Sequence, residues 1–263
     1  MALKTGNMDA KLRPPVRVLA RLDTKSDKVI KGIHLEGWRI VGDAESLCKK
    51  YYDQKADEII LIDAVASLYN RGKLIQIIKK SAENLFIPLT AGGGVKSIWD
   101  AEELFKSGAD KVTINSAIVT NPNLISEISK NFGSQSLVVS IQAKKENDKW
   151  NVFYDSAREK TDKNILDWIK ICQDLGAGEF LITSIDKEGT EEGFDLQLME
   201  AVSEKSNIPI IASGGFGKLS DLKNIFEFKN VTGVAIANML HKNTFTVSDI
   251  KKYLLENKIN TRN

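Results

Sequence analysis

Short hydrophobic runs alternate with longer amphipathic stretches along the chain. Each run is rich in Val, Ile and Leu, has the length of a buried strand and is followed by apolar positions at helical spacing. The eight runs span residues 16–22, 58–62, 87–90, 111–114, 137–141, 179–183, 208–212 and 233–237. Eight strands separated by helices predict parallel pairing with right-handed crossovers. Eight regular units favour closure into a single (β/α)8 TIM barrel over an open doubly wound sheet.

Two further patterns refine this fold. Residues 144–154 place Asn147 and Asp148 between polar and aromatic positions, which predicts a hairpin after the fifth strand. Segment 87–94 also resembles segment 208–215, so the chain repeats itself at about 120 residues. That period is too long for a solenoid repeat. It predicts a barrel built from two half-barrels, with functional positions in pairs.

Size and charge narrow the class of protein. The 263 residues, 42% of them hydrophobic, suit one barrel domain at residues 16–263 with a flexible extension at residues 1–15. The 37 basic and 35 acidic residues nearly cancel, and this argues against nucleic acid and anionic membrane as partners. No apolar run approaches the ~18 residues of a membrane span. The N-terminus lacks the apolar core of a secretory signal, so we expect a cytoplasmic protein.

The cysteines give no sign of a metal or another cofactor. Cys48 and Cys172 fall in helix-like stretches, and neither lies in a Cys/His cluster with metal-ligand spacing. We therefore expect both to be reduced structural residues.

Glycine-rich loops follow strands of both half-barrels. After the third and fourth strands come Gly93, Gly94, Asn115 and Ser116. Their counterparts in the second half are Gly189, Thr190, Gly214, Gly215 and Asn238. Such loops let backbone N–H groups and a helix N-terminus approach a phosphate. Paired loops predict two phosphate sites, although each loop alone could simply turn the chain.

Four charged residues stand where strands begin. They are Arg17, Glu58, Lys111 and Glu179. If Asp23 points inward, the two-residue period of a strand also turns Arg21, Leu19 and Arg17 inward. The strand-start face of such barrels contributes stability rather than chemistry. A solvated rim of charges and a closed ring of ion pairs across the barrel floor both fit this pattern.

Several motifs resemble the cyclase subunit of imidazole glycerol phosphate synthase. They are LDTK at 22–25, VIKG at 29–32, ADKVTIN at 109–115, FGSQSLVV at 132–139, GAGE at 176–179 and TSIDKEGT at 183–190. The resemblance covers about residues 17–253. It implies a heterodimer with a glutaminase subunit on the strand-start face. Ammonia would then cross the barrel to a doubly phosphorylated small molecule at the opposite mouth.

The same resemblance implies roles for individual residues. The four strand-start charges match the family's ammonia gate, and Asp110 matches a residue at the glutaminase interface. Lys31 and Thr183, together with the glycine loops, match the substrate and phosphate sites.

The catalytic pair of the family is incomplete in this chain. The resemblance places aspartates at the ends of the first and fifth strands, where Asp23 and Gln142 stand. An amide does not exchange protons near neutral pH, so a contribution on the order of 10²- to 10⁴-fold from a positioned acid or base is missing. Candidate replacements are Asp63, Asp186, Glu188 and Asp195. Each of these could equally be an ordinary loop or capping carboxylate.

Other departures from the family's sequence pattern point to a different acceptor of the ammonia. Arg21 stands where the family has a small cysteine, and Ile40 stands where the substrate-covering loop has an aspartate. These features resemble a branch of cyclase-like paralogues that feed ammonia to a third protein, which amidinates a sugar for surface polysaccharide. We therefore expect a paralogue of that branch. The alternatives are the authentic cyclase of histidine biosynthesis and a non-catalytic barrel that only activates the glutaminase.

Overall fold

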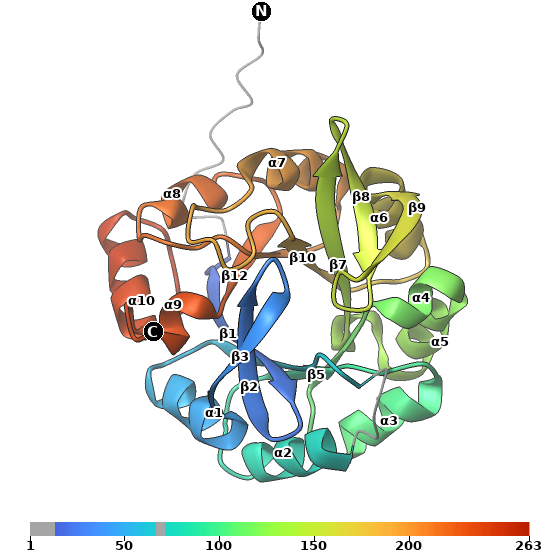
Figure 1. The fold of residues 1–263 in the computed structure, drawn as a ribbon, viewed down its shortest axis with the longest axis horizontal. Helices are drawn as coiled ribbons and strands as arrows, with labels where there is room; N and C mark the ends of the chain where they lie inside the picture. The colour runs from blue at the N-terminus through green and yellow to red at the C-terminus, as the bar shows by residue number, and fades with distance from the viewer. Residues whose placement is uncertain (1–13, 67–71, 263) are drawn as a thin grey trace, which may run out of the picture.

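Parallel strands form a closed ring at the centre of the computed structural model, which describes residues 14–66 and 72–262 (Figure 1). The eight barrel strands are β1 (Arg17–Lys25), β4 (Glu58–Asp63), β5 (Leu89–Gly92), β6 (Lys111–Ile114), β7 (Leu137–Glu146), β10 (Glu179–Ser184), β11 (Ile210–Ser213) and β12 (Val231–Ile236). The ring closes because β1 pairs with both β4 and β12, and β7 pairs with both β6 and β10. The predicted (β/α)8 barrel is confirmed.

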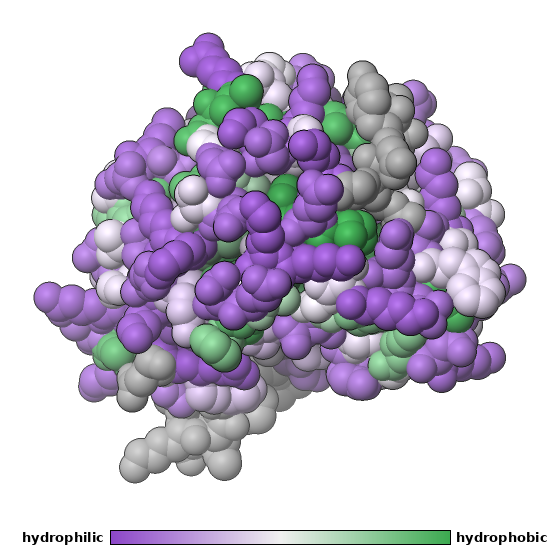
Figure 2. Space-filling model, turned by 90° about the horizontal axis from the view of Figure 1, so that it is seen from below, coloured by the Kyte–Doolittle hydropathy of each residue, from purple (hydrophilic) through white to green (hydrophobic). Residues whose placement is uncertain are grey.

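Helices surround the ring of strands. They are α1 (Ala44–Asp53), α2 (Gly72–Ala82), α3 (Ile98–Lys106), α4 (Ser116–Thr120), α5 (Asn123–Phe132), α6 (Ile165–Asp174), α7 (Leu196–Lys205), α8 (Asp221–Ile225), α9 (Asn238–His241) and α10 (Val247–Glu256), with a 3-10 turn, η1 (Ser134–Ser136). Capping boxes begin α3 at Ser97 and α10 at Thr246. The side of the molecule in Figure 2 is mostly hydrophilic with scattered hydrophobic patches, as expected for amphipathic helices whose apolar stripes face the strands.

Two predictions concern chain ends and membranes. Residues 1–13 of the predicted N-terminal extension lie outside the described residues. Within the described ranges, no helix combines the length and the apolar character needed to span a membrane.

Two antiparallel additions rise from the barrel strands. The predicted hairpin after the fifth strand is confirmed: β7 turns at Asn147 and Asp148 into β8 (Lys149–Tyr154). Both turn residues have left-handed backbone, with φ of 47° and 63°, as tight hairpins require. A third strand, β9 (Glu159–Asn164), pairs with β8 and was not predicted. Another unpredicted hairpin, β2 (Lys28–Ile33) with β3 (Glu36–Asp43), extends β1 and lies across the barrel mouth in Figure 1.

Two strands begin later than their hydrophobic runs suggest. The run at 87–90 becomes β5 from Leu89, and the run at 208–212 becomes β11 from Ile210. Each strand follows a proline, Pro88 or Pro209, which has no N–H to donate to a neighbouring strand. Their carbonyl groups still accept hydrogen bonds from Ile59 and Phe180, at 3.0 and 2.9 Å.

The barrel interior is layered. Its middle layer is apolar and consists of Leu19, Ile60, Val138, Leu181, Ile211 and Ala235. The inward alternation predicted for β1 is confirmed, because Arg17 lies on the floor side of Leu19 and Arg21 on the mouth side. Asp63 has the opposite parity to Ile60 and reaches the mouth at the end of β4.

Candidate active site

The four strand-start charges meet across the barrel floor. Lys111 Nζ lies 2.9 Å from Glu58 Oε2 and 3.0 Å from Glu179 Oε2. Arg17 Nη1 lies 3.2 Å from the same Glu58 oxygen, and its other terminal nitrogen contacts Glu179. Burial alone would raise the pKa of Glu179, but the adjacent Arg17 and Lys111 lower it below the ordinary value. The structure thus contains a closed ring of two cations and two carboxylates; its role as a gate stays a prediction.

Asp110 lies beside this ring on the strand-start face. Its side chain is exposed, and Oδ2 accepts a hydrogen bond of 2.8 Å from the backbone N–H of Leu89. That contact fixes the carboxylate at the surface predicted to bind a glutaminase.

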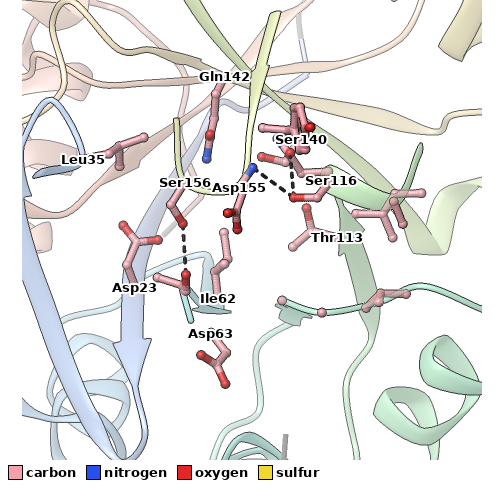
Figure 3. Close-up of a pocket in the computed structure, with 18 of the residues that line it drawn as sticks. Asp23, Leu35, Ile62, Asp63, Thr113, Ser116, Ser140, Gln142, Asp155 and Ser156 are labelled. Atoms are coloured by element: carbon pink, nitrogen blue, oxygen red, sulfur yellow. Dashed lines mark hydrogen bonds between the residues drawn. The ribbon is translucent and has the colours of Figure 1, made fainter. Parts of the chain in front are cut away.

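A cavity of about 400 Å³ opens at the opposite end of the barrel. Among its lining residues are Asp23, Lys31, Gly93, Gly94, Asn115, Ser116 and Gln142, all of them predicted site residues. Strands β1 and β7 stand on opposite sides of the ring, so Asp23 and Gln142 face the cavity from opposite walls. Figure 3 shows both side chains with Thr113, Ser116 and Ser140 around the same space.

Arg21 organises the wall that carries Asp23. Its Nε donates to Asp23 Oδ1 at 3.1 Å. Its Nη1 donates to Thr183 Oγ1 at 2.9 Å and to Ser213 Oγ at 3.0 Å. Arg21 is 3% exposed and therefore forms a buried polar bridge from β1 to β10 and β11. The predicted substrate residue Thr183 is engaged by this bridge and does not line the described cavity.

Gln142 holds a loop that sequence reasoning did not identify. Its Oε1 accepts a hydrogen bond of 2.8 Å from the N–H of Ala157, in the connection between β8 and β9. Asp155 N donates to Ser116 Oγ at 3.1 Å, and Ser156 Oγ donates to the carbonyl of Ala64 at 3.0 Å (Figure 3). Three consecutive residues, 155–157, have left-handed backbone. Their sequence, Asp-Ser-Ala, suggests a turn, but nothing in it places that turn over the mouth.

The second group of predicted phosphate residues surrounds a much smaller space. Gly189, Gly214, Gly215 and Asn238 line a pocket of about 20 Å³. Glu188 and Glu191 also line it, and Lys31 lies between this pocket and the main cavity. Thr190 is not among the lining residues, and its hydroxyl donates to the carbonyl of Lys187 at 2.9 Å. The structure therefore brings the two groups of predicted residues to one mouth, but in unequal surroundings.

The hairpin of β2 and β3 contacts residues beside this second pocket through hydrogen bonds and an ion pair. His34 N donates to the carbonyl of Glu188, and His34 Nδ1 contacts the carbonyl of Ile185, both at 2.8 Å. The buried ammonium of Lys31 contacts the Glu188 carboxylate. The hairpin thus carries Lys31 into the mouth.

The four carboxylates considered as substitutes for the second aspartate have different surroundings. Asp63 lines the main cavity, and its Oδ1 accepts from Val65 N at 3.0 Å. Asp186 accepts from the N–H of Lys145, and Asp195 caps α7. Asp63 is therefore the one of the four that lines the main cavity.

Neither cysteine is placed for catalysis or metal binding. Cys48 and Cys172 are free and buried, and burial raises the pKa of both thiols to about 12. Among the described residues, no three or more His, Cys, Asp or Glu side chains are grouped to hold a metal ion.

Comparisons with known proteins agree with this architecture. The model of a family described as "Histidine biosynthesis protein" matches residues 17–246. Imidazole glycerol phosphate synthase subunit HisF from Legionella pneumophila is 53% identical over 207 residues, which are 78% of this chain and 98% of that protein. The HisF subunits of Prochlorococcus marinus (strain MIT 9215) and Natranaerobius thermophilus are each 40% identical over 94% of this chain and 98% of their own. The chain therefore belongs to the histidine biosynthesis protein family, among the HisF-type subunits of imidazole glycerol phosphate synthase.

Proposed function

We propose that this chain is the synthase subunit of a two-protein glutamine amidotransferase. A glutaminase docks on the strand-start face around Asp110, and ammonia crosses the barrel to a phosphorylated acceptor in the mouth. The observation that carries the proposal is the buried charge ring, which lies directly beneath a single apolar layer on the axis that ends at the cavity. A floor needed only for stability would not require two carboxylates and two cations, because buried ion pairs contribute little net stability.

The reaction favoured first is that of imidazole glycerol phosphate synthase in histidine biosynthesis. The relatives described above are subunits of that enzyme, and this supports the histidine pathway better than the polysaccharide branch that we expected from the sequence. In this reaction Asp23 acts as the acid or base on one wall of the mouth. The missing partner on the other wall is replaced by Asp63, the candidate carboxylate that lines the same cavity.

A specific observation keeps the polysaccharide branch as a second candidate. Gln142 uses its amide oxygen to hold the loop at Ala157 and has no proton to exchange. Arg21 adds a buried guanidinium to the Asp23 wall. Both features fit an acceptor whose chemistry is completed by a third protein. The isolated chain with ammonium salt separates the candidates, because only the first predicts turnover of the histidine-pathway substrate.

The gate is tested by reversing one of its charges. Lys111→Glu places three carboxylates around Arg17 and should disrupt the ring. With the glutaminase present, we expect glutamine hydrolysis to continue while glutamine-dependent product falls at least tenfold relative to ammonium-dependent product. Lys106→Glu, an exposed change on α3, is the control. Coupling that is equal in Lys111→Glu and the unaltered chain would remove the gate from the proposal.

A further inference from the structure

We propose that Gln142 is a positioning residue, which holds the loop 155–157 as a bridge over one side of the mouth, and that the loop presents Asp155 to hydroxyl groups of the acceptor. Gln142 then acts on the acceptor through the loop, in a role that needs an amide or carboxylate oxygen and no exchangeable proton. The inference deepens the proposed function and rests on it only in taking the mouth as the acceptor site.

The loop joins strand ends that are not neighbours in the ring. The N–H of Ala157 donates to Gln142 on β7 at 2.8 Å. The Ser156 hydroxyl donates to the carbonyl of Ala64, directly after β4, at 3.0 Å, and the N–H of Ala64 donates to the carbonyl of Thr24 on β1 at 2.9 Å. Strands β5 and β6 lie between β4 and β7 in the ring. The loop therefore passes over the ends of β5 and β6.

The backbone of the loop needs support from other elements. Asp155, Ser156 and Ala157 have φ of 51°, 57° and 65°. Residues with a Cβ atom normally adopt this left-handed conformation singly, because each one is unfavourable. Such conformations persist where the surrounding structure determines them, and they cluster at functional sites. The hydrogen bonds to Gln142 and Ala64, with that from Asp155 N to Ser116 Oγ, supply the support here.

The oxygen of the Gln142 amide is the atom that the loop requires. The backbone N–H of Ala157 can only donate, so the amide turns its oxygen to the loop and its NH₂ group away from it. Gln142 is 9% exposed and lines the main cavity. A leucine at this position would fill a similar space without an acceptor. A glutamate would keep an oxygen at the same place along the side chain.

Asp155 is the charged group that the loop brings to the cavity. Figure 3 shows its carboxylate in the space that Asp23 also faces, and both residues line the cavity. Arg158 Nη2 lies 2.8 Å from Asp155 Oδ1, in a pair whose side chains are 42% and 27% exposed. An ionised carboxylate has about four acceptor positions, so Asp155 can accept from acceptor hydroxyls in addition to Arg158. This side of the mouth therefore suits a polyhydroxylated part of the acceptor.

Hydrogen exchange of backbone amides tests the positioning role. Gln142→Leu should speed exchange of the Ala157 amide about fivefold, the factor that corresponds to about 1 kcal/mol for one hydrogen bond. Gln142→Glu should keep the rate of the unaltered chain. Ser156→Ala, which removes the tether to Ala64, should also speed exchange and does not alter the barrel interior. Gln135→Leu makes the same chemical change at an exposed glutamine on η1 and is the control.

Two outcomes would overturn the positioning role. One is exchange in Gln142→Leu that is no faster than in Gln135→Leu. The other is exchange in Gln142→Glu that is as fast as in Gln142→Leu.

Two probes test recognition by Asp155. Ribose 5-phosphate has hydroxyl groups and inorganic phosphate has no sugar hydroxyls, so calorimetric titration should show tighter binding of the first by at least about threefold, within the range for one hydrogen bond. Asp155→Gly and Gln142→Leu should lose this preference. Glycine readily adopts the φ of 51° at Asp155, and an unchanged exchange rate at Ala157 will show that the loop is retained. Glu159→Ala removes a nearby exposed carboxylate and should keep the preference.

A preference that survives in Asp155→Gly, or equal binding of both probes by the unaltered chain, would overturn the role of Asp155. Neither experiment uses glutaminase or turnover, so failure here is distinct from failure of the coupling experiment.

Discussion

The charge ring on the barrel floor makes a quantitative prediction about stability. Lys111→Met removes one cation while retaining a side chain of similar length. Arg17 is then the one cation of the ring that Glu58 and Glu179 share, although Glu58 keeps its hydrogen bond from Thr90, and Glu58 is 1% exposed. The substitution therefore leaves carboxylates out of water with too few partners.

The magnitude follows from how deeply the ring is buried. Removing one partner of a buried ion pair costs about 3–5 kcal/mol. The Lys111 side chain is 18% exposed, so water can reach the position that its ammonium group vacates. We therefore take the lower end of the range of about 3–5 kcal/mol. We expect the free energy of unfolding to fall by about 3 kcal/mol. For a chain of this size that corresponds to a melting temperature about 6–12 °C lower.

Thermal and urea unfolding of matched variants measure the effect. Lys106→Met is the control, because Lys106 lies 2.9 Å from Glu102 but is 72% exposed. Exposed pairs contribute little, so its melting temperature should change by less than about 2 °C. The loss in Lys111→Met should also persist at high salt, since buried charges are poorly screened. Equal melting temperatures for the two variants would refute the description of the floor as a desolvated ion network.

Two further predictions concern pH and catalysis. Burial lowers the pKa of His241 to about 4, against 6.5 unfolded, so the unfolded chain binds the proton first as pH falls. The free energy of unfolding should therefore drop by about 2 kcal/mol between pH 7.5 and pH 5. In urea unfolding, the His241→Gln variant should lack this pH-dependent loss. The same dependence on pH in the variant and the unaltered chain would contradict the prediction. Gln142→Asp should raise ammonium-dependent turnover of the histidine-pathway substrate at least tenfold. The control Gln142→Asn shortens the side chain without adding a carboxylate and should not raise turnover. Turnover of roughly 1 s⁻¹ or more in the unaltered chain would show that another group supplies the proton.

The barrel and its floor could be predicted because their signals are local and periodic. Alternation along β1 orders Arg17, Leu19 and Arg21 on the inward face, and each lies there. The four ring members come from four strands, but each stands at a strand start, and a closed barrel brings strand starts together. The barrel topology therefore brings charged residues that stand at separate strand starts into direct contact.

The hairpin over the mouth could not be predicted in the same way. Its turn uses His34 and Leu35 with φ of 52° and 64°, although tight hairpins favour Asn and Gly at such positions. The turn is stabilised instead by hydrogen bonds to Ile185 and Glu188, about 150 residues away. Tertiary contacts here override the local preference, so the sequence of the turn contains no signal for it.

The two glycine loops illustrate the same limit at the site itself. The repeat between residues 87–94 and 208–215 identifies where the backbone can approach a ligand, and both loops do lie at the mouth. Whether a carboxylate folds back into that space depends on partners from other elements, such as Lys31 from β2 and Asn238 at the start of α9. The repeat therefore predicts that both loops lie at the mouth, but it does not predict their unequal surroundings.

This asymmetry has a consequence for the chemistry. Asp23 and Arg21 line the main cavity, which also reaches Gly93 after β5 and Asn115 after β6, whereas the second pocket is much smaller. Asp23 lies at the end of β1, which β4 and β5 separate from β6 in the ring of strands. If ammonia crosses the apolar layer as proposed, it emerges beside Arg21, whose fixed positive charge opposes the passage of ammonium but not of the neutral molecule. Under the proposed function, the acceptor carbon and neutral ammonia would thus meet near Asp23 and Asp63, two cavity-lining carboxylates on the neighbouring strands β1 and β4.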